Sequence, residues 1–337
     1  MLDDEAYGTR NKRGDWKPFK GPEIAPLFAW PARPVALAKW LFGWDGYLFP
    51  WNFVWGALSV ALWLYLTPSL ETMETFAPDW ILSLFAINAV LLTLTVSFFH
   101  VPLYVKRRQG TAFKFNARWP SKNSAFLFND QTIDNVIWSF ASGVTIWTAY
   151  EAVTFWAYAN DVIPYVSFSD HPVYFALLLL VIPFVSELHF YVMHRLVHIP
   201  FLYRLAHKIH HNNVNPGPWS GLSMHPVEHV LYFSNVLLFW IVPANPIHAM
   251  FMLVRGGLAP SVAHTGFGKM VVQDEKAIDL DYMHYLHHKH FECNYGSTLV
   301  PFDEWFQTFH DGSEEAEKRM NERFKRAAAK QGAKNRW

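Results

Sequence analysis

Three histidine clusters are the strongest candidates in the sequence for a chemical role, because of their residue type and spacing. One cluster is a His-x-x-x-His pair and two are His-x-x-His-His triplets: His194 and His198; His207, His210 and His211; His284, His287 and His288. On an α-helix, positions three or four residues apart lie on the same side one turn apart, about 40° around the axis for a spacing of four. We therefore expect each cluster to present its imidazoles together as a ligand face.

The chemistry of imidazole indicates a transition metal. Neutral imidazole suits iron, zinc, copper or nickel, whereas magnesium and calcium prefer oxygen ligands. Eight imidazoles exceed the capacity of one ion, so their convergence predicts two ions, and His264, which follows a predicted hairpin, is a plausible ninth ligand. The single Cys293 excludes a zinc ribbon, a cysteine-ligated iron–sulfur cluster and an internal disulfide framework. A redox-active non-haem centre therefore fits better than a structural zinc.

Carboxylates near the clusters are candidates to hold the imidazole rings in position, as ligand histidines usually require. They are Glu187, Glu228, Asp281 and Glu292. His189 lies five residues before His194, about 140° around the same helix, and is expected to be a weaker ligand than its neighbours. Residues 225–229 differ from the zinc-protease signature H-E-x-x-H and are expected to form a lid or a positioning segment at the head of the predicted hairpin. Residues 291–306 are expected to close over the site.

The composition of the chain indicates which elements position these residues. Of its 337 residues, 52% are hydrophobic, 18% aromatic and 17% charged, and 16 are Trp. This is too apolar for an ordinary soluble enzyme, and Trp is enriched where lipid meets water. Lys and Arg together number 28, as do Asp and Glu, and the resulting net charge of zero excludes a nucleic-acid-binding protein. The composition favours an integral membrane protein.

Apolar segments long enough to cross a hydrocarbon layer of about 30 Å occur several times. Residues 51–70, 80–105 and 229–254 lack Asp, Glu, Lys and Arg, and weaker candidates run over 133–159 and 172–191. Pro243 and Pro246 interrupt the third segment, which favours a hairpin that enters and leaves on one side; a single straight span is the alternative. We therefore predict an all-α integral membrane helical bundle of about four spans plus a re-entrant helical hairpin, with a histidine-rich helical cap.

Basic and acidic stretches alternate between these segments. Residues 1–50 and 106–122 are rich in Lys and Arg, whereas 69–79 and 160–171 carry acidic residues and no Lys or Arg. By the positive-inside rule, the N-terminus and the histidine-rich cap are cytoplasmic. No apolar core with a cleavage site begins the chain, so we expect no cleaved signal peptide. The predicted parts are a cytoplasmic segment 1–50, a first transmembrane hairpin and basic loop 51–130, a catalytic domain 131–312 and a polar C-terminal helix 313–337.

Together, these motifs resemble the sterol desaturase and fatty acid hydroxylase superfamily. The resemblance rests on the three clusters in order, on His225-Pro226-x-Glu228, on His264-x-Gly266-Phe267 and on Asn294-Tyr295-Gly296, over roughly residues 130–312. Two positions depart from the pattern. His189 stands where C5 sterol desaturase-like members commonly have an aromatic residue, and Tyr285 stands where the third motif usually has Asp. The branch within the superfamily therefore stays open.

Members of that superfamily are membrane-embedded oxygenases, and the resemblance implies the same activity here. It implies two iron ions, O₂ as co-substrate and electrons from cytochrome b5 or a ferredoxin-like donor, used to hydroxylate, oxidise or desaturate a C–H position of a sterol-like or acyl lipid from the bilayer. Carried over by position, the implied ligands are His194, His198, His207, His210, His211, His264, His284, His287 and His288. The oligomeric state stays open.

Two functions of other classes also stay open at this stage. A membrane metal-binding or transport protein would require ionisable ligands inside several spans, whereas the clusters follow the predicted spans. A zinc-dependent membrane hydrolase would require one zinc with three protein ligands and an adjacent general base, for which eight clustered imidazoles are too many. Both considerations favour the oxidoreductase.

Overall fold

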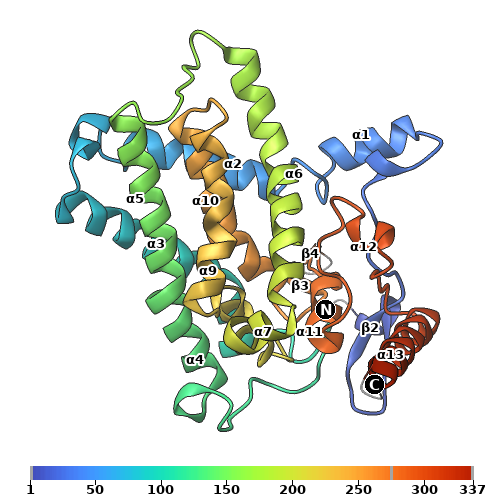
Figure 1. Cartoon of the computed structure of the whole chain (residues 1–337). Helices are drawn as coiled ribbons and strands as arrows, with labels where there is room; N and C mark the ends of the chain where they lie inside the picture. Colours follow the sequence, from blue (N-terminus) through green and yellow to red (C-terminus); the bar gives the residue numbers. More distant parts are fainter. Residues whose placement is uncertain (1–2, 274–275, 335–337) are drawn as a thin grey trace.

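Helices make up most of the chain (Figure 1). The computed structural model describes residues 3–273 and 276–334. The α-helices are α1 (Pro34–Phe42), α2 (Trp51–Tyr65), α3 (Pro78–His100), α4 (Gln131–Trp138), α5 (Thr145–Ala159), α6 (Pro172–Val197), α7 (Pro200–Leu202), α8 (Lys208–His211), α9 (Pro226–Phe233), α10 (Pro246–Ala263), α11 (Met283–His290), α12 (Phe302–Trp305) and α13 (Glu314–Lys334). The predicted helical architecture is therefore correct for most of the chain.

Two short antiparallel hairpins depart from the all-α prediction. Strand β1 (Gly8–Arg10) pairs with β2 (Trp16–Pro18), and β3 (Lys269–Gln273) pairs with β4 (Lys276–Asp279). Each strand has three to five residues, which is too short for a clear alternation of apolar and polar side chains. The sequence analysis therefore missed both hairpins.

Two helices of the described chain are long and apolar enough to cross a membrane. One is α3 with its π-helical extension, Pro78–Val105, of 28 residues, and the other is α6, of 26 residues. Helix α2 has 15 residues, or about 22 Å at 1.5 Å per residue, which is shorter than the predicted span over 51–70. The helical stretch 131–159 is continuous but contains Asp134 and Glu151. The structure thus supports two of the predicted spans.

The segment predicted as a hairpin reverses direction. Helix α9 and the 3₁₀ turns after it end at Trp240, and α10 begins at Pro246 after Asn245, whose side chain accepts a hydrogen bond from the Ile247 N–H at 3.1 Å. The Tyr232 hydroxyl donates to the Gly256 carbonyl at 3.0 Å and joins the two arms. The two prolines interrupt the backbone as predicted, and the alternative of one straight helix is wrong.

Helix α10 lies at the centre of the bundle and contacts α2, α3, α5 and α6 (Figure 1). Its residues 248–254 are all buried. Gly257 permits the closest approach, because a Cβ at this position would lie 2.4 Å from the Trp147 ring. The apolar run that the sequence analysis assigned to a membrane segment is therefore also explained by burial against protein, since hydropathy alone does not distinguish protein from lipid surroundings.

The predicted N-terminal segment and the predicted C-terminal helix both contact the rest of the protein. Tyr47, in the predicted cytoplasmic segment 1–50, donates to the Leu180 carbonyl in the middle of α6, and its ring lies 5.1 Å from that of Phe184. The predicted C-terminal helix is present as α13, and its Arg323 donates to the Gln307 carbonyl at 2.9 Å. Residues 335–337 of the predicted tail lie outside the described residues.

Candidate metal centre

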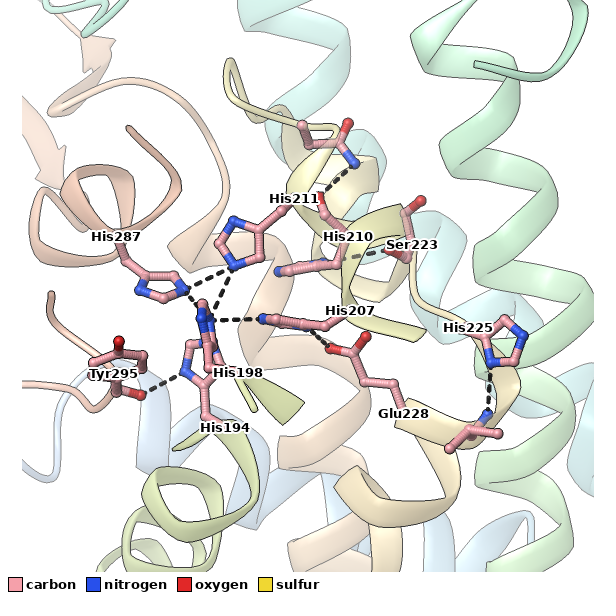
Figure 2. Close-up of polar contacts among 12 residues, drawn as sticks. His194, His198, His207, His210, His211, Ser223, His225, Glu228, His287 and Tyr295 are labelled. Carbon is pink, nitrogen blue, oxygen red and sulfur yellow. Dashed lines mark hydrogen bonds and ion pairs between the residues drawn. The ribbon is translucent and has the colours of Figure 1, made fainter. Parts of the chain in front are cut away.

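The structure brings the nine histidines named from the sequence into two adjacent groups. Within each group, the candidate ligand atoms all lie within 4.8 Å of one another. The five-histidine group consists of His194, His198, His207, His211 and His287. The four-histidine group consists of His210, His264, His284 and His288. These residues come from the end of α6, from the segment 203–211, from the end of α10 and from α11, so four separate parts of the chain meet here. Figure 2 shows the five-histidine group together with His210.

In both groups, the Nε2 atoms converge. In the five-histidine group, His198 Nε2 lies 3.1 Å from Nε2 of His207 and 3.3 Å from Nε2 of His211 (Figure 2). In the four-histidine group, His264 Nε2 lies 3.0 Å from Nε2 of both His284 and His288. Metal–nitrogen bonds of about 2.0–2.1 Å place neighbouring ligand atoms about 3 Å apart, so both groups have the spacing that one ion requires.

The opposite ring nitrogens contact hydrogen-bond acceptors. Four imidazoles have Nδ1 against a backbone carbonyl: His194 at 2.6 Å from Tyr295, His287 at 2.7 Å from Cys293, His264 at 2.7 Å from Pro260 and His210 at 3.3 Å from Ser223. Because a carbonyl only accepts, these contacts assign the proton to Nδ1 and leave the Nε2 lone pair pointing into the group. Converging lone pairs repel one another unless a cation lies between them. The residues therefore fit a metal ion in each group.

Each triplet divides between the two groups. His207 and His211 belong to the five-histidine group, whereas His210 belongs to the four-histidine group. In α11, His284 and His288 lie together and His287 lies in the other group. Positions i and i+4 differ by about 40°, but i+3 and i+4 differ by about 100°, so the third imidazole points to the neighbouring group. The prediction that each triplet forms one ligand face is wrong in this respect, because the triplets link the two groups.

Burial keeps these imidazoles neutral. Loss of hydration lowers the pKa of His264 to about 4. It also lowers the pKa values of His211, His284 and His288 well below the usual value, and interactions with neighbouring imidazoles lower them further. A neutral ring retains the lone pair that a metal ion requires. Near neutral pH, the groups therefore do not have to lose protons before they bind metal.

Among the five predicted supporting side chains, only Glu228 contacts a ligand ring in the described chain. Its Oε1 accepts from His207 Nδ1 at 2.7 Å (Figure 2). Burial raises the pKa of Glu228 to about 8, and a bound cation would favour its charged form. His225 accepts from the Val227 N–H at 3.2 Å and caps α9, the helix that carries Glu228. Of the lid and positioning roles predicted for residues 225–229, these contacts support positioning.

The other four predicted residues have different partners. Glu187 accepts from the backbone N–H and hydroxyl of Ser297 at 2.6 and 2.8 Å. Asp281 accepts from the backbone N–H of His284 at 3.1 Å, and Glu292 accepts from the Tyr295 hydroxyl at 3.0 Å. His189 lies outside both groups, with Nε2 2.9 Å from the Ser234 hydroxyl. These residues position the surroundings of the site and do not contact the ligand rings directly.

Asp303 supports the site although the sequence analysis gave it no role. It is 1% exposed and accepts from the backbone N–H groups of Tyr295 and Gly296 at 3.0 and 2.7 Å, and from the Thr308 hydroxyl at 2.5 Å. It therefore holds the loop whose Tyr295 and Cys293 carbonyls orient two ligand histidines. A lone Asp in an aromatic loop carries no local signal for this role.

A cavity of about 160 Å³ lies against both groups. Five ligand histidines line it: His194 and His207 from the five-histidine group, and His210, His264 and His284 from the four-histidine group. Much of the remaining wall is apolar, with Phe190, Met193, Val197, Met224, Leu231 and Ala259. The largely apolar lining beside both candidate metal positions is typical of a site for an apolar ligand.

Comparisons with known proteins agree with this site. The fatty acid hydroxylase family model matches residues 175–308. The chain is 31% identical over 124 residues to the Delta(7)-sterol 5(6)-desaturase ERG3B of Gibberella zeae, covering 36% of this chain and 38% of that protein. It is 26% identical over 128 residues to a putative methylsterol monooxygenase of Dictyostelium discoideum, covering 37% and 47%. It is 31% identical over 86 residues to the fatty acid hydroxylase ahd1 of Mycosarcoma maydis, covering 24% and 22%.

The matched region spans less than half the length of each of these relatives. No solved structure matches the chain. The family match nevertheless includes all nine clustered histidines, in the order and spacing described above. These matches support the assignment of residues 175–308 to the sterol desaturase and fatty acid hydroxylase superfamily.

Proposed function

We propose that this chain is a membrane-bound di-iron oxidoreductase that uses O₂ and an external electron donor to hydroxylate, oxidise or desaturate a C–H position of a sterol-like or acyl lipid. One observation carries the proposal: two groups of converging imidazoles lie on the wall of one largely apolar cavity. The relatives named as sterol desaturases, a methylsterol monooxygenase and a fatty acid hydroxylase support a lipid substrate. The names of these relatives describe different reactions, so the proposal includes hydroxylation, oxidation and desaturation.

A lipid C–H bond offers no acidic proton and no leaving group, so acid–base chemistry by side chains alone does not cleave it. Two iron ions, when held by the five- and four-histidine groups, would supply the redox chemistry that activates O₂. The residues of the chain have other tasks. The Tyr295, Cys293 and Pro260 carbonyls fix the ring orientations. The apolar cavity wall excludes water from the substrate.

The proposed membrane placement has the histidine groups at the cytoplasmic surface. Both candidate spans begin after the acidic stretches 69–79 and 160–171 and end at the histidine side. The Tyr104 hydroxyl, in the extension of α3, donates to the Thr265 carbonyl at 2.7 Å, beside His264. The basic residues 106–108 follow this extension, which supports a cytoplasmic location. A soluble or membrane-anchored electron donor such as cytochrome b5 or ferredoxin would then reach the site from the cytosol.

The ligand arrangement favours this function over the two alternatives. A zinc-dependent hydrolase generally uses three protein ligands around one open zinc, whereas the chain gathers nine imidazoles in two groups. A metal transporter requires ligands along a path across the membrane. Here the ligands lie in two adjacent groups where α6, α10 and α11 meet.

Metal analysis of the purified full-length protein tests the proposal. We expect about two iron ions per chain, and fewer in His211→Ala and His288→Ala. The matched control is His171→Ala, because His171 is exposed and belongs to neither group. Lipid profiles of cells with and without the protein should then differ by one added hydroxyl, oxo group or double bond. One zinc ion, or no metal, together with unchanged activity in both ligand variants would overturn the proposal.

A further inference from the structure

Arg255 is a charged residue inside the central helix of the bundle. It is the only residue between positions 248 and 258 that is not fully buried, and it lines the cavity. Its Nε donates to Asn52 Oδ1 at 3.3 Å. It forms no ion pair with a described residue, and Glu187 on the same cavity wall bonds to Ser297 instead. The guanidinium therefore has hydrogen-bond donors available to the cavity.

Two more polar atoms on the cavity wall lack partners. Ser186 Oγ and Asn235 Oδ1 are buried and have no hydrogen-bond partner among the described residues, and both residues line the cavity with Arg255. Buried polar groups in proteins are almost always hydrogen-bonded, so two unsatisfied oxygens on the same cavity wall as a guanidinium without an ion pair indicate a missing polar ligand. The unsatisfied oxygens of Ser186 and Asn235 thus indicate a polar ligand independently of the charge of Arg255.

Ser186 and Arg255 lie at similar distances along their helices from the candidate metal ligands. On α6, Ser186 precedes His194 by eight residues, which is about 12 Å at 1.5 Å per residue. On α10, Arg255 precedes His264 by nine residues, or about 13 Å. The two helices contact each other, and grouped histidines lie at the C-terminal end of each. Phe190 and Met193 on α6 and Ala259 on α10 line the cavity between these two levels.

We propose that Arg255, with Ser186 and Asn235, binds the oxygen-bearing head of an otherwise apolar lipid and so determines which carbon faces the histidine groups. A guanidinium only donates hydrogen bonds, so the head must accept them through a hydroxyl, carbonyl or carboxylate oxygen. A hydrocarbon of the same shape would leave the three polar side chains unpaired. The selection of the reacting carbon rests on the proposed function, whereas the binding of the head does not.

The test measures binding of defined probes to the full-length protein in lipid nanodiscs. The probes are cholesterol with its hydrocarbon analogue cholestane, and stearic acid with octadecane, so the two arms distinguish a sterol hydroxyl from an acyl carboxylate. We expect Arg255→Met to weaken binding of the oxygen-bearing probe about tenfold or more and to leave binding of its hydrocarbon analogue unchanged. The matched control is Arg204→Met, an exposed arginine that does not line the cavity. It should change neither affinity.

Arg255→Lys and Ser186→Ala provide variants with smaller changes in packing. Arg255→Lys should retain part of the preference for oxygen, and Ser186→Ala should lose part of it. The inference is overturned if neither oxygen-bearing probe binds wild type more tightly than its hydrocarbon, or if Arg255→Met weakens both members of a pair equally. Iron content and lipid oxidation are measured in parallel. Arg255-dependent binding without iron or oxidation would refute the proposed function and leave this inference intact.

Discussion

The two histidine groups have the same kind of ligand but different supports. All members of the four-histidine group are buried, and His264 is oriented by a carbonyl of α10, the central helix. The five-histidine group includes the partly exposed His198, and its His194 and His287 are oriented by carbonyls of the loop that Asp303 holds. One group therefore depends on the central helix and the other on the buried loop 293–296, so substitutions should affect the two groups separately.

The largest expected effect is the removal of a ligand from the four-histidine group. His264→Ala leaves three imidazoles, so we expect the loss of about one of two iron ions and a decrease in lipid oxidation of roughly 100-fold or more. His198→Ala leaves four imidazoles in the five-histidine group and should retain more iron. Iron per chain by mass spectrometry, together with product formation, measures both. Equal iron loss in the two variants would contradict the difference between the groups.

Asp303→Ala should weaken the five-histidine group through its loop. The substitution leaves three buried donors without their acceptor, and we expect a loss of about 2–4 kcal/mol in stability. The measurements are thermal unfolding and the rate of iron release to a chelator, which should become biphasic with one fast-released iron. Asp311→Asn is the control, since Asp311 bonds to Ser313 outside this loop. Equal acceleration of both irons would show that the loop does not distinguish the groups.

Glu228→Ala should have a smaller effect, confined to His207. Loss of the acceptor at Nδ1 frees the ring to rotate, and such changes weaken metal binding about 10- to 100-fold. Glu228→Gln retains an oxygen acceptor and should recover part of this loss. Competition against a chelator gives the affinity. Glu292→Gln is the matched control because Glu292 contacts the Tyr295 hydroxyl and no ligand ring, and an equal loss in this variant would argue against a specific role for Glu228.

A separate prediction concerns the contribution of His264 to acid sensitivity in the metal-free protein, which is less than about 1 kcal/mol within half a pH unit of pH 6.5. Burial lowers the pKa of His264 to about 4 in the folded state, against 6.5 as its ordinary value. Between these values, only the unfolded chain binds the proton, so stability falls by about 1.4 kcal/mol per pH unit as pH decreases. There is no contribution above pH 6.5 and no further loss below about pH 4. Unfolding of His264→Gln, compared with wild type at several pH values, should show a shallower slope; an unchanged slope would refute the assignment.

Much of the site was predictable because its signals are local. The histidine types, their spacing and the two prolines of the hairpin predicted which histidines come together and where the chain reverses. The span count was predicted less well, because α10 is apolar through burial among other helices. The supporting carboxylates were also predicted poorly. Of five named side chains only Glu228 contacts a ligand ring, and backbone carbonyls, which every residue carries, orient several others.

The sequence by itself determined which residues can bind metal, because residue type sets ligand chemistry and a rotation of about 100° per residue sets the faces of each helix. Only the tertiary structure decided that His210 and His287 leave their own triplets for the opposite groups. It also decided that Arg255 and Ser186 line one cavity with the histidines. These arrangements depend on which helix packs against which, and packing between distant segments leaves no periodic signal in either segment alone.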